Sequence, residues 1–122
     1  MVFGGNPAGW ILRFPGSDLS VYHAGDTGMF SEMELINELY KPQYIILPIG
    51  GIFTMGPEEA AFTVKKFFKN AHTVIPMHYA TFPALTGTFE AFKLELSKIG
   101  VLDKHLIDPF DQMINKWLEL RV

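Results

Sequence analysis

The sequence contains no cysteine, which excludes disulfide bonds and thiolate ligands for a metal. It also lacks a long hydrophobic run, because the longest apolar stretch, residues 44–49, is interrupted by Pro48. A membrane span needs roughly 20 apolar residues, so none is expected. No secretory signal is visible at the N-terminus either. These absences favour a reducing compartment, and we expect the protein in the cytoplasm.

Positive charge is scarce as well. Ten Lys and Arg stand against 13 Asp and Glu, which gives a formal net charge of −3. The nearest thing to a basic patch is Lys65, Lys66 and Lys69, which we place on the solvent-exposed side of a helix. We therefore expect neither nucleic acid nor membrane as a partner.

Apolar residues are plentiful. The 122 residues suffice for one domain, and 48% of them are hydrophobic, including 11 Phe. The mean hydropathy of +0.17 is high for a small domain with a polar surface. We expect the chain to bury apolar surface against another copy of itself or a missing segment.

Hydrophobic periodicity predicts alternating strands and helices. Residues 9–14 and 19–23 form a hairpin, and residues 44–47, 72–77 and 104–107 form further strands. The strand 44–47 is apolar on both faces, which is typical of a central parallel strand.

Three helices are predicted between these strands. Ser31 and Glu34 form a capping box, Pro57 occupies the first turn of the second helix, and Thr88 caps the third. After residue 110 we expect a short helix running into a last strand. The predicted buried residues are Leu35, Ile36, Leu39 and Tyr40 in the first helix, Ala60, Ala61, Val64, Phe67 and Phe68 in the second, and Phe89, Phe92, Leu96 and Ile99 in the third.

The order of these elements brings three loops together. Residues 19–77 read as strand, helix, strand, helix, strand, and right-handed crossovers make such strands parallel. The loops 25–28, 50–54 and 78–81 then share one edge of the sheet, where α/β proteins place their chemistry.

Asp26 and His78 are the candidate metal ligands, because a carboxylate and an imidazole at one sheet edge suit zinc or a harder divalent metal. His23 is either a partner that orients a ligand or a half-buried strand residue. By position alone, substrate contacts are expected from Thr54, Tyr79 and Thr81.

Other motifs give weaker evidence for a functional site. Gly50-Gly51 either lets a ligand approach the backbone or makes a tight exit from a strand. His72 and His105 are expected on the surface. The glycine-rich residues 4–9 lack the Gly-Lys-Ser/Thr of a phosphate loop, and no Gly-x-Ser-x-Gly elbow is present.

Three ordered blocks resemble one family: residues 22–28 (YHAGDTG), residues 47–61 (LPIGG with FTMGPEEAA) and residues 75–83 (IPMHY with TFP), preceded by NPAG at 6–9. They resemble an uncharacterised family of metal-dependent hydrolases in the metallo-β-lactamase superfamily, close to the ascorbate-6-phosphate lactonase branch. The likeness covers residues 6–100.

The resemblance implies an αββα sandwich with a dinuclear metal site. Asp26 matches the aspartate that bridges the two metals, and His78 matches a late ligand histidine. The superfamily's upstream His-x-His-x-Asp-His block is not found here. The chain therefore resembles a C-terminal half: an α/β half-sandwich over residues 1–122, a mixed sheet with helices on one face, lacking the N-terminal metal-binding half.

The implied activity is hydrolysis of a small ester, lactone or phosphoester, with Zn or Mn as cofactor and Asp26 and His78 as catalytic ligands. We expect the isolated chain to be inactive, because a catalytic zinc needs three protein ligands. Its partners are then a small-molecule substrate and the missing N-terminal half or another copy. The alternatives are a non-catalytic fragment or subunit, and a superfamily nuclease, which the acidic charge argues against.

Overall fold

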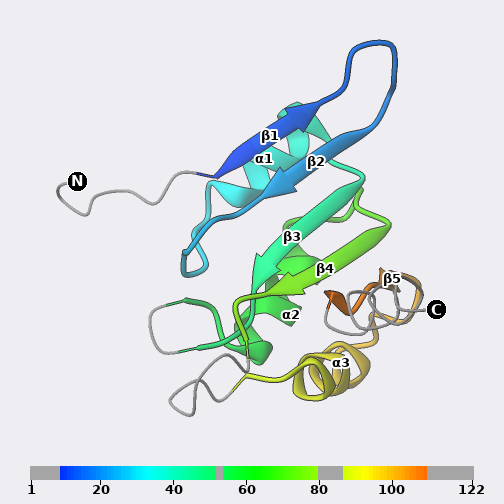
Figure 1. Cartoon of the computed structure of the whole chain (residues 1–122). Coiled ribbons are helices and arrows are strands. Elements are labelled where there is room, and N and C mark those ends of the chain that lie inside the picture. The colour runs from blue at the N-terminus through cyan, green and yellow to red at the C-terminus, as the bar shows by residue number, and fades with distance from the viewer. Residues whose placement is uncertain (1–8, 52–53, 80–86, 110–122) are drawn as a thin grey trace, which may run out of the picture.

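The computed structural model describes residues 9–51, 54–79 and 87–109, which build a mixed sheet with helices packed on it (Figure 1). In chain order the elements are β1 (Trp10–Arg13), β2 (Ser20–His23), α1 (Met33–Tyr40), β3 (Tyr44–Pro48), α2 (Pro57–Lys66), β4 (Thr73–Met77), α3 (Phe89–Lys98) and β5 (His105–Leu106). All five predicted strands and all three predicted helices are confirmed, with shifted ends. The helix and strand expected after residue 110 lie outside the described residues.

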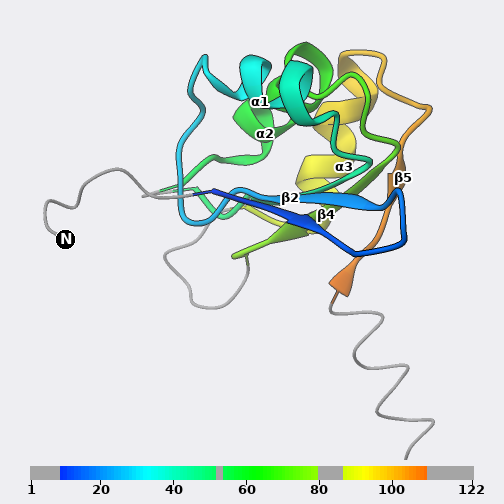
Figure 2. The ribbon, with the colours of Figure 1, turned by 90° about the horizontal axis from the view of Figure 1, so that it is seen from above.

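The strands follow one another across the sheet in the order β1-β2-β3-β4-β5. β1 pairs with β2 antiparallel, as the predicted hairpin requires, and the remaining neighbours are parallel. Each crossover moves to the next strand in the same direction, so right-handed crossovers place α1, α2 and α3 on the same face. Figure 2 shows this single layer of helices above the sheet. The predicted α/β half-sandwich is therefore confirmed.

The core lies between the sheet and this helix layer. Ile45, Leu47 and Val74 from the strands are fully buried there, and the ring of Tyr22 stacks on Phe68 with 5.1 Å between centroids. The apolar stripes predicted for α2 and α3 face this core. The Thr88 cap of α3 is confirmed, because the Ala91 N–H donates to Thr88 Oγ1 at 3.0 Å.

The prediction for α1 is partly wrong. Glu32 is the N-cap residue and makes no side-chain cap, while the Ser31 hydroxyl donates to the Glu32 carboxylate instead. Met33 and Asn37 are the buried residues of the helix, and of the predicted face only Ile36 packs on the core. The other three, Leu35, Leu39 and Tyr40, are exposed. Asn37 is held inward because its side chain donates to Asn70 Oδ1 at 2.9 Å.

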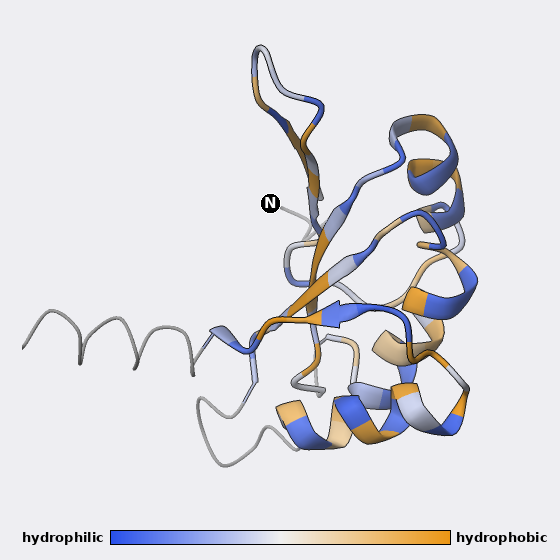
Figure 3. Ribbon diagram, turned by 90° about the vertical axis from the view of Figure 1, so that its right-hand side faces the viewer, coloured by the Kyte–Doolittle hydropathy of each residue, from blue (hydrophilic) through white to orange (hydrophobic). Residues whose placement is uncertain are grey.

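The face of the sheet opposite the helices is covered by no described element. β3 is the central strand and pairs parallel on both sides, as predicted, and its Tyr44 and Ile46 are partly exposed on the open face. We define the open sheet face by Trp10, Leu12, Val21, Ile46 and Ile75, which are all apolar and at least partly exposed. Figure 3 shows the hydrophobic stretches of the strands and the helices on one side only. Among the described residues, no helix is long and apolar enough to cross a membrane.

Association through the open sheet face is the first testable prediction. Trp10 is 63% exposed and Leu12 is 46% exposed, and large apolar side chains clustered on one face favour burial against a partner. We expect a dimer or larger assembly that buries this face, and obligate interfaces of this kind cover more than about 2,000 Å². Light scattering at micromolar concentration measures this, with Leu12→Lys as the disruptive variant and Leu102→Lys, an exposed site off the sheet face, as control. A stable wild-type monomer contradicts the prediction.

A second prediction concerns Tyr22, whose buried hydroxyl has no hydrogen-bond partner among the described residues. Leaving such a group unsatisfied costs stability, so Tyr22→Phe is expected to raise the free energy of unfolding by about 1 kcal/mol at pH 7. Burial also raises the pKa of Tyr22 from 10.0 to about 12. As pH rises, the unfolded chain loses this proton first, so stability holds below pH 10 and falls between pH 10 and about 12.

Urea denaturation at pH 7 and at pH values between 10 and 12 measures both effects. We expect Tyr22 to account for an alkaline loss of about 2–3 kcal/mol, and Tyr22→Phe to remove that part of the loss. Tyr44→Phe, at a partly exposed ring, is the matched control and keeps it. A clear loss of stability of Tyr22→Phe at pH 7 contradicts the prediction.

Candidate metal centre

Asp26 is carried by a tight turn at the end of β2. The Ala24 N–H still donates to the Ile46 carbonyl at 3.0 Å, so the pairing with β3 continues one residue past the strand. Gly25 then takes a φ of +73°, a left-handed conformation that glycine adopts without steric cost. The Gly25 N–H donates to His23 Nδ1 at 3.1 Å, which fixes the turn. The Asp26 side chain leaves this turn at the carboxyl edge of the sheet.

His78 follows β4 at the same edge. Its φ is +59°, which is uncommon for a residue with a side chain. The residue before it is anchored, because the Met77 carbonyl accepts the Ile49 N–H at 3.0 Å. The left-handed turn redirects the chain where the strand ends, and the imidazole projects over the edge.

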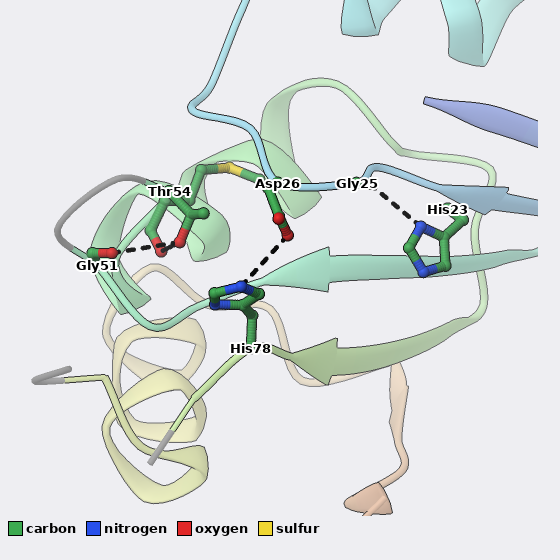
Figure 4. A network of polar contacts seen from close by, with 7 residues as sticks. His23, Gly25, Asp26, Gly51, Thr54 and His78 are labelled. Carbon is green, nitrogen blue, oxygen red and sulfur yellow. Dashed lines mark hydrogen bonds and ion pairs between the residues drawn. The ribbon is translucent and has the colours of Figure 1, made fainter. Parts of the chain in front are cut away.

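These two side chains meet. His78 Nε2 lies 3.4 Å from Asp26 Oδ1, and Figure 4 shows the imidazole and the carboxylate pointing toward each other. Two ligands of one zinc ion at ~2.0–2.2 Å from it lie about 3–4 Å apart, so the spacing suits a shared metal. The His78 side chain is 40% exposed and the Asp26 side chain is 71% exposed, so the pair is open to solvent and to a further ligand.

Within the described part of the chain, Asp26 and His78 alone do not complete a metal site. Residues 9–51, 54–79 and 87–109 contain no group of three or more His, Asp or Glu side chains that could hold a metal ion. His72 and His105 lie at the opposite end of the strands, at the starts of β4 and β5, and are exposed as predicted. A carboxylate and an imidazole can anchor a divalent ion, but further ligands must come from elsewhere.

Comparison with known proteins places this chain in a family. Residues 3–78 match the model of the beta-lactamase superfamily domain. The chain belongs to the beta-lactamase superfamily. This confirms the family that the three sequence blocks indicate, and it matches the half-sandwich fold.

Relatives of this chain are named as metal-dependent hydrolases. A metal-dependent hydrolase of Methanoculleus marisnigri is 45% identical over 107 residues, which are 88% of this chain and 46% of the relative. One from Caldivirga maquilingensis is 51% identical over 89 residues, covering 73% and 37%. The solved structure of Igni18, a metallo hydrolase of Ignicoccus hospitalis, aligns with a TM-score of 0.71 at 39% identity, covering 88% and 45%. The chain thus spans less than half the length of these relatives.

The other residues predicted near the site from their sequence positions have different environments. The single O–H of Thr54 has the carbonyls of Gly51 and Met55 within hydrogen-bonding distance, so it is engaged in its own loop (Figure 4). His23 is a half-buried residue at the end of β2, and its Nδ1 also accepts the Gly25 N–H in the turn that carries Asp26, so both alternatives describe its position. Tyr79 is only 4% exposed and belongs to the hydrophobic core, so its side chain is not open to a substrate. Thr81 lies outside the described residues.

The Gly50-Gly51 pair makes a tight exit from β3. The Gly50 carbonyl accepts the Gly87 N–H at 3.1 Å, and Gly51 has a φ of +84°. The backbone that approaches these glycines is therefore the chain's own. The loop after β2 is linked to the loop after β3, because the Met55 N–H donates to the Thr27 carbonyl at 3.1 Å.

Asp108 was not predicted from the sequence. It follows β5 and accepts a hydrogen bond of 2.6 Å from the Tyr79 hydroxyl. The pKa of Tyr79 is raised well above its ordinary value, mainly by burial of the hydroxyl. The hydrogen bond to Asp108 and the negative charge of Asp108 raise it further. The hydroxyl therefore stays protonated and donates a hydrogen bond to the Asp108 carboxylate. The sequence predicted only the strand at 104–107 just before it, and the structure shows that this strand pairs parallel to β4.

Proposed function

We propose that this chain supplies Asp26 and His78 to the divalent-metal site of a hydrolase. The observation that carries the proposal is the 3.4 Å approach of a carboxylate and an imidazole from two separate strand ends. The names of the relatives support it, since metal-dependent hydrolases share 45–51% identity with this chain. The substrate class we propose is a small ester, lactone or phosphoester, and the metal is Zn or Mn in a dinuclear site.

The donor set fits such a metal. Carboxylate oxygen and imidazole nitrogen are ligands that both zinc and manganese accept. Asp26 has two oxygens and is 71% exposed, so its second oxygen is free to face a second ion. When bound, a divalent metal polarises the scissile bond and lowers the pKa of water. Asp26 and His78 hold and orient it, and the His23 bond keeps the Asp26 turn in place.

The competing proposal is a non-catalytic subunit. It is favoured by the absence of a third clustered ligand in the described residues. Under this proposal the chain contributes two ligands and a packing surface, and a partner with the remaining ligands completes the site. A further segment like those of the longer relatives, or a second copy, would fill that role on the open sheet face.

Metal binding by the chain itself tests the ligand assignment. Titration with Mn²⁺ is expected to broaden the NMR signals of His78 and Asp26 first and to leave His72 and His105 sharp, because paramagnetic broadening falls steeply with distance. Asp26→Asn and His78→Ala are each expected to weaken zinc binding at least about tenfold, since even residues that only support a ligand contribute that much.

His72→Ala is the matched control, because this exposed histidine lies at the other end of β4. It is expected to leave zinc binding unchanged. Equal broadening of all histidines, or zinc affinity insensitive to both site variants, contradicts the assignment.

A further inference from the structure

The backbone of His78 is unusual and has no local explanation. In the described residues only Lys41 and His78 combine a side chain with a positive φ. Lys41 ends α1, where a left-handed residue is a common helix terminator. His78 ends a strand, and the left-handed region there persists only when the surroundings hold it.

Two neighbouring residues hold His78 from opposite sides. On one side, the Met77 carbonyl is fixed by the Ile49 N–H at 3.0 Å. On the other side, the Tyr79 ring belongs to the hydrophobic core, and its hydroxyl donates to Asp108 Oδ1 at 2.6 Å. That distance is in the range of a strong hydrogen bond between a hydroxyl and a carboxylate.

Asp108 is itself anchored to the sheet. The Ile107 N–H just before it donates to the Val74 carbonyl at 3.1 Å, which continues the pairing of β5 with β4. Because these strands are parallel, the residues after them lie at the same edge. The carboxylate is therefore a fixed point toward which the Tyr79 side chain is directed.

We propose that Asp108, acting through Tyr79, is a positioning residue for His78. The Tyr79–Asp108 bond sets the direction of the chain after His78 and so keeps the left-handed turn that aims the imidazole at Asp26. Without it the turn relaxes to an ordinary conformation and Nε2 moves away from the carboxylate. The proposal rests on the proposed function, in which His78 is a metal ligand.

The test compares Tyr79→Phe, Asp108→Ala and Asp108→Asn. Tyr79→Phe keeps the buried ring and removes only the donor, so the core is retained. Asp108→Asn keeps an oxygen that can accept the bond and is the conservative rescue. Asn70→Ala removes the remote Asn37–Asn70 bond and is the control for a general loss of stability.

Three quantities are measured for each variant of the whole chain. The three-bond HN–Hα coupling of His78 reports its φ, zinc titration reports metal affinity, and thermal unfolding reports stability. Tyr79→Phe and Asp108→Ala are expected to change the coupling and to weaken zinc binding about 10- to 100-fold. Asp108→Asn is expected to retain most of the affinity. Asn70→Ala is expected to lower Tm alone.

The outcomes separate this proposal from the proposed function. If Tyr79→Phe and Asp108→Ala lower Tm but leave the coupling and the zinc affinity at wild-type values, the bond is merely structural and the proposal is overturned. If the wild-type chain shows no metal response at His78, the proposed function fails, and the metal role of Asp108 fails with it. In that case, a change in the φ of His78 in the Tyr79 and Asp108 variants would support only the conformational role of the Tyr79–Asp108 bond.

Discussion

Fusing this chain behind the N-terminal half of a relative is expected to create a hydrolase that Asp26→Asn inactivates. The Methanoculleus marisnigri hydrolase is a suitable donor, since this chain matches 46% of it at 45% identity. Asp26→Asn removes the negative charge that we propose to bridge two metal ions. Losing roughly 4 kcal/mol of transition-state stabilisation corresponds to about a 1,000-fold fall in kcat/KM. His78→Ala is expected to cost at least about 100-fold, since even residues that only support a ligand contribute 10- to 100-fold.

The assay uses a panel of lactones and phosphoesters, with zinc or manganese and with a chelator. His72→Ala in the fusion is the control and is expected to keep full activity, because His72 is remote from the carboxyl edge. The 122-residue chain alone is expected to be inactive under the same conditions. Turnover by the chain alone that survives Asp26→Asn would place the chemistry in other residues.

Gly87→Ala is expected to have the largest effect on stability. A Cβ at Gly87 would lie 1.8 Å from the Ile49 carbonyl oxygen and 2.8 Å from its carbon, so the backbone itself must move. The same movement would break the Gly87–Gly50 hydrogen bond. Overpacking of this kind is expected to lower the free energy of unfolding by about 3 kcal/mol or more.

Gly28→Ala is the matched control, since an added Cβ there has no atom within 4 Å. It is expected to change stability by less than about 0.5 kcal/mol. Urea denaturation followed by circular dichroism compares the two variants with the wild type. A loss below about 1 kcal/mol for Gly87→Ala would show that the loops after β3 and before α3 separate easily.

Much of the fold was predictable because its signals are local. Alternation of apolar and polar residues specified the β1–β2 hairpin, and the spacing of apolar residues specified the buried sides of α2 and α3. Pro57 and Thr88 marked the helix starts through their own conformational limits. The order of these elements then placed Asp26 and His78 at one edge, since consecutive right-handed crossovers allow only that arrangement.

α1 shows where local signals fail. Its leucines are spaced like a buried stripe, yet Leu35 is 53% exposed and Leu39 is 72% exposed. Met33 and the Asn37–Asn70 bond fix the rotation of this helix instead. Asn70 lies 33 residues away in sequence, so no pattern within the helix predicts the bond.

The sequence by itself determined the family, the order of strands and helices, and the edge at which the two proposed ligands lie. Only the tertiary structure decided that these ligands approach to 3.4 Å, that His78 is left-handed and that Asp108 binds Tyr79. Secondary structure follows from residues a few positions apart, whose spacing is readable in the chain. Contacts between strand ends depend on how sheet pairing and loop geometry set distances between residues dozens of positions apart.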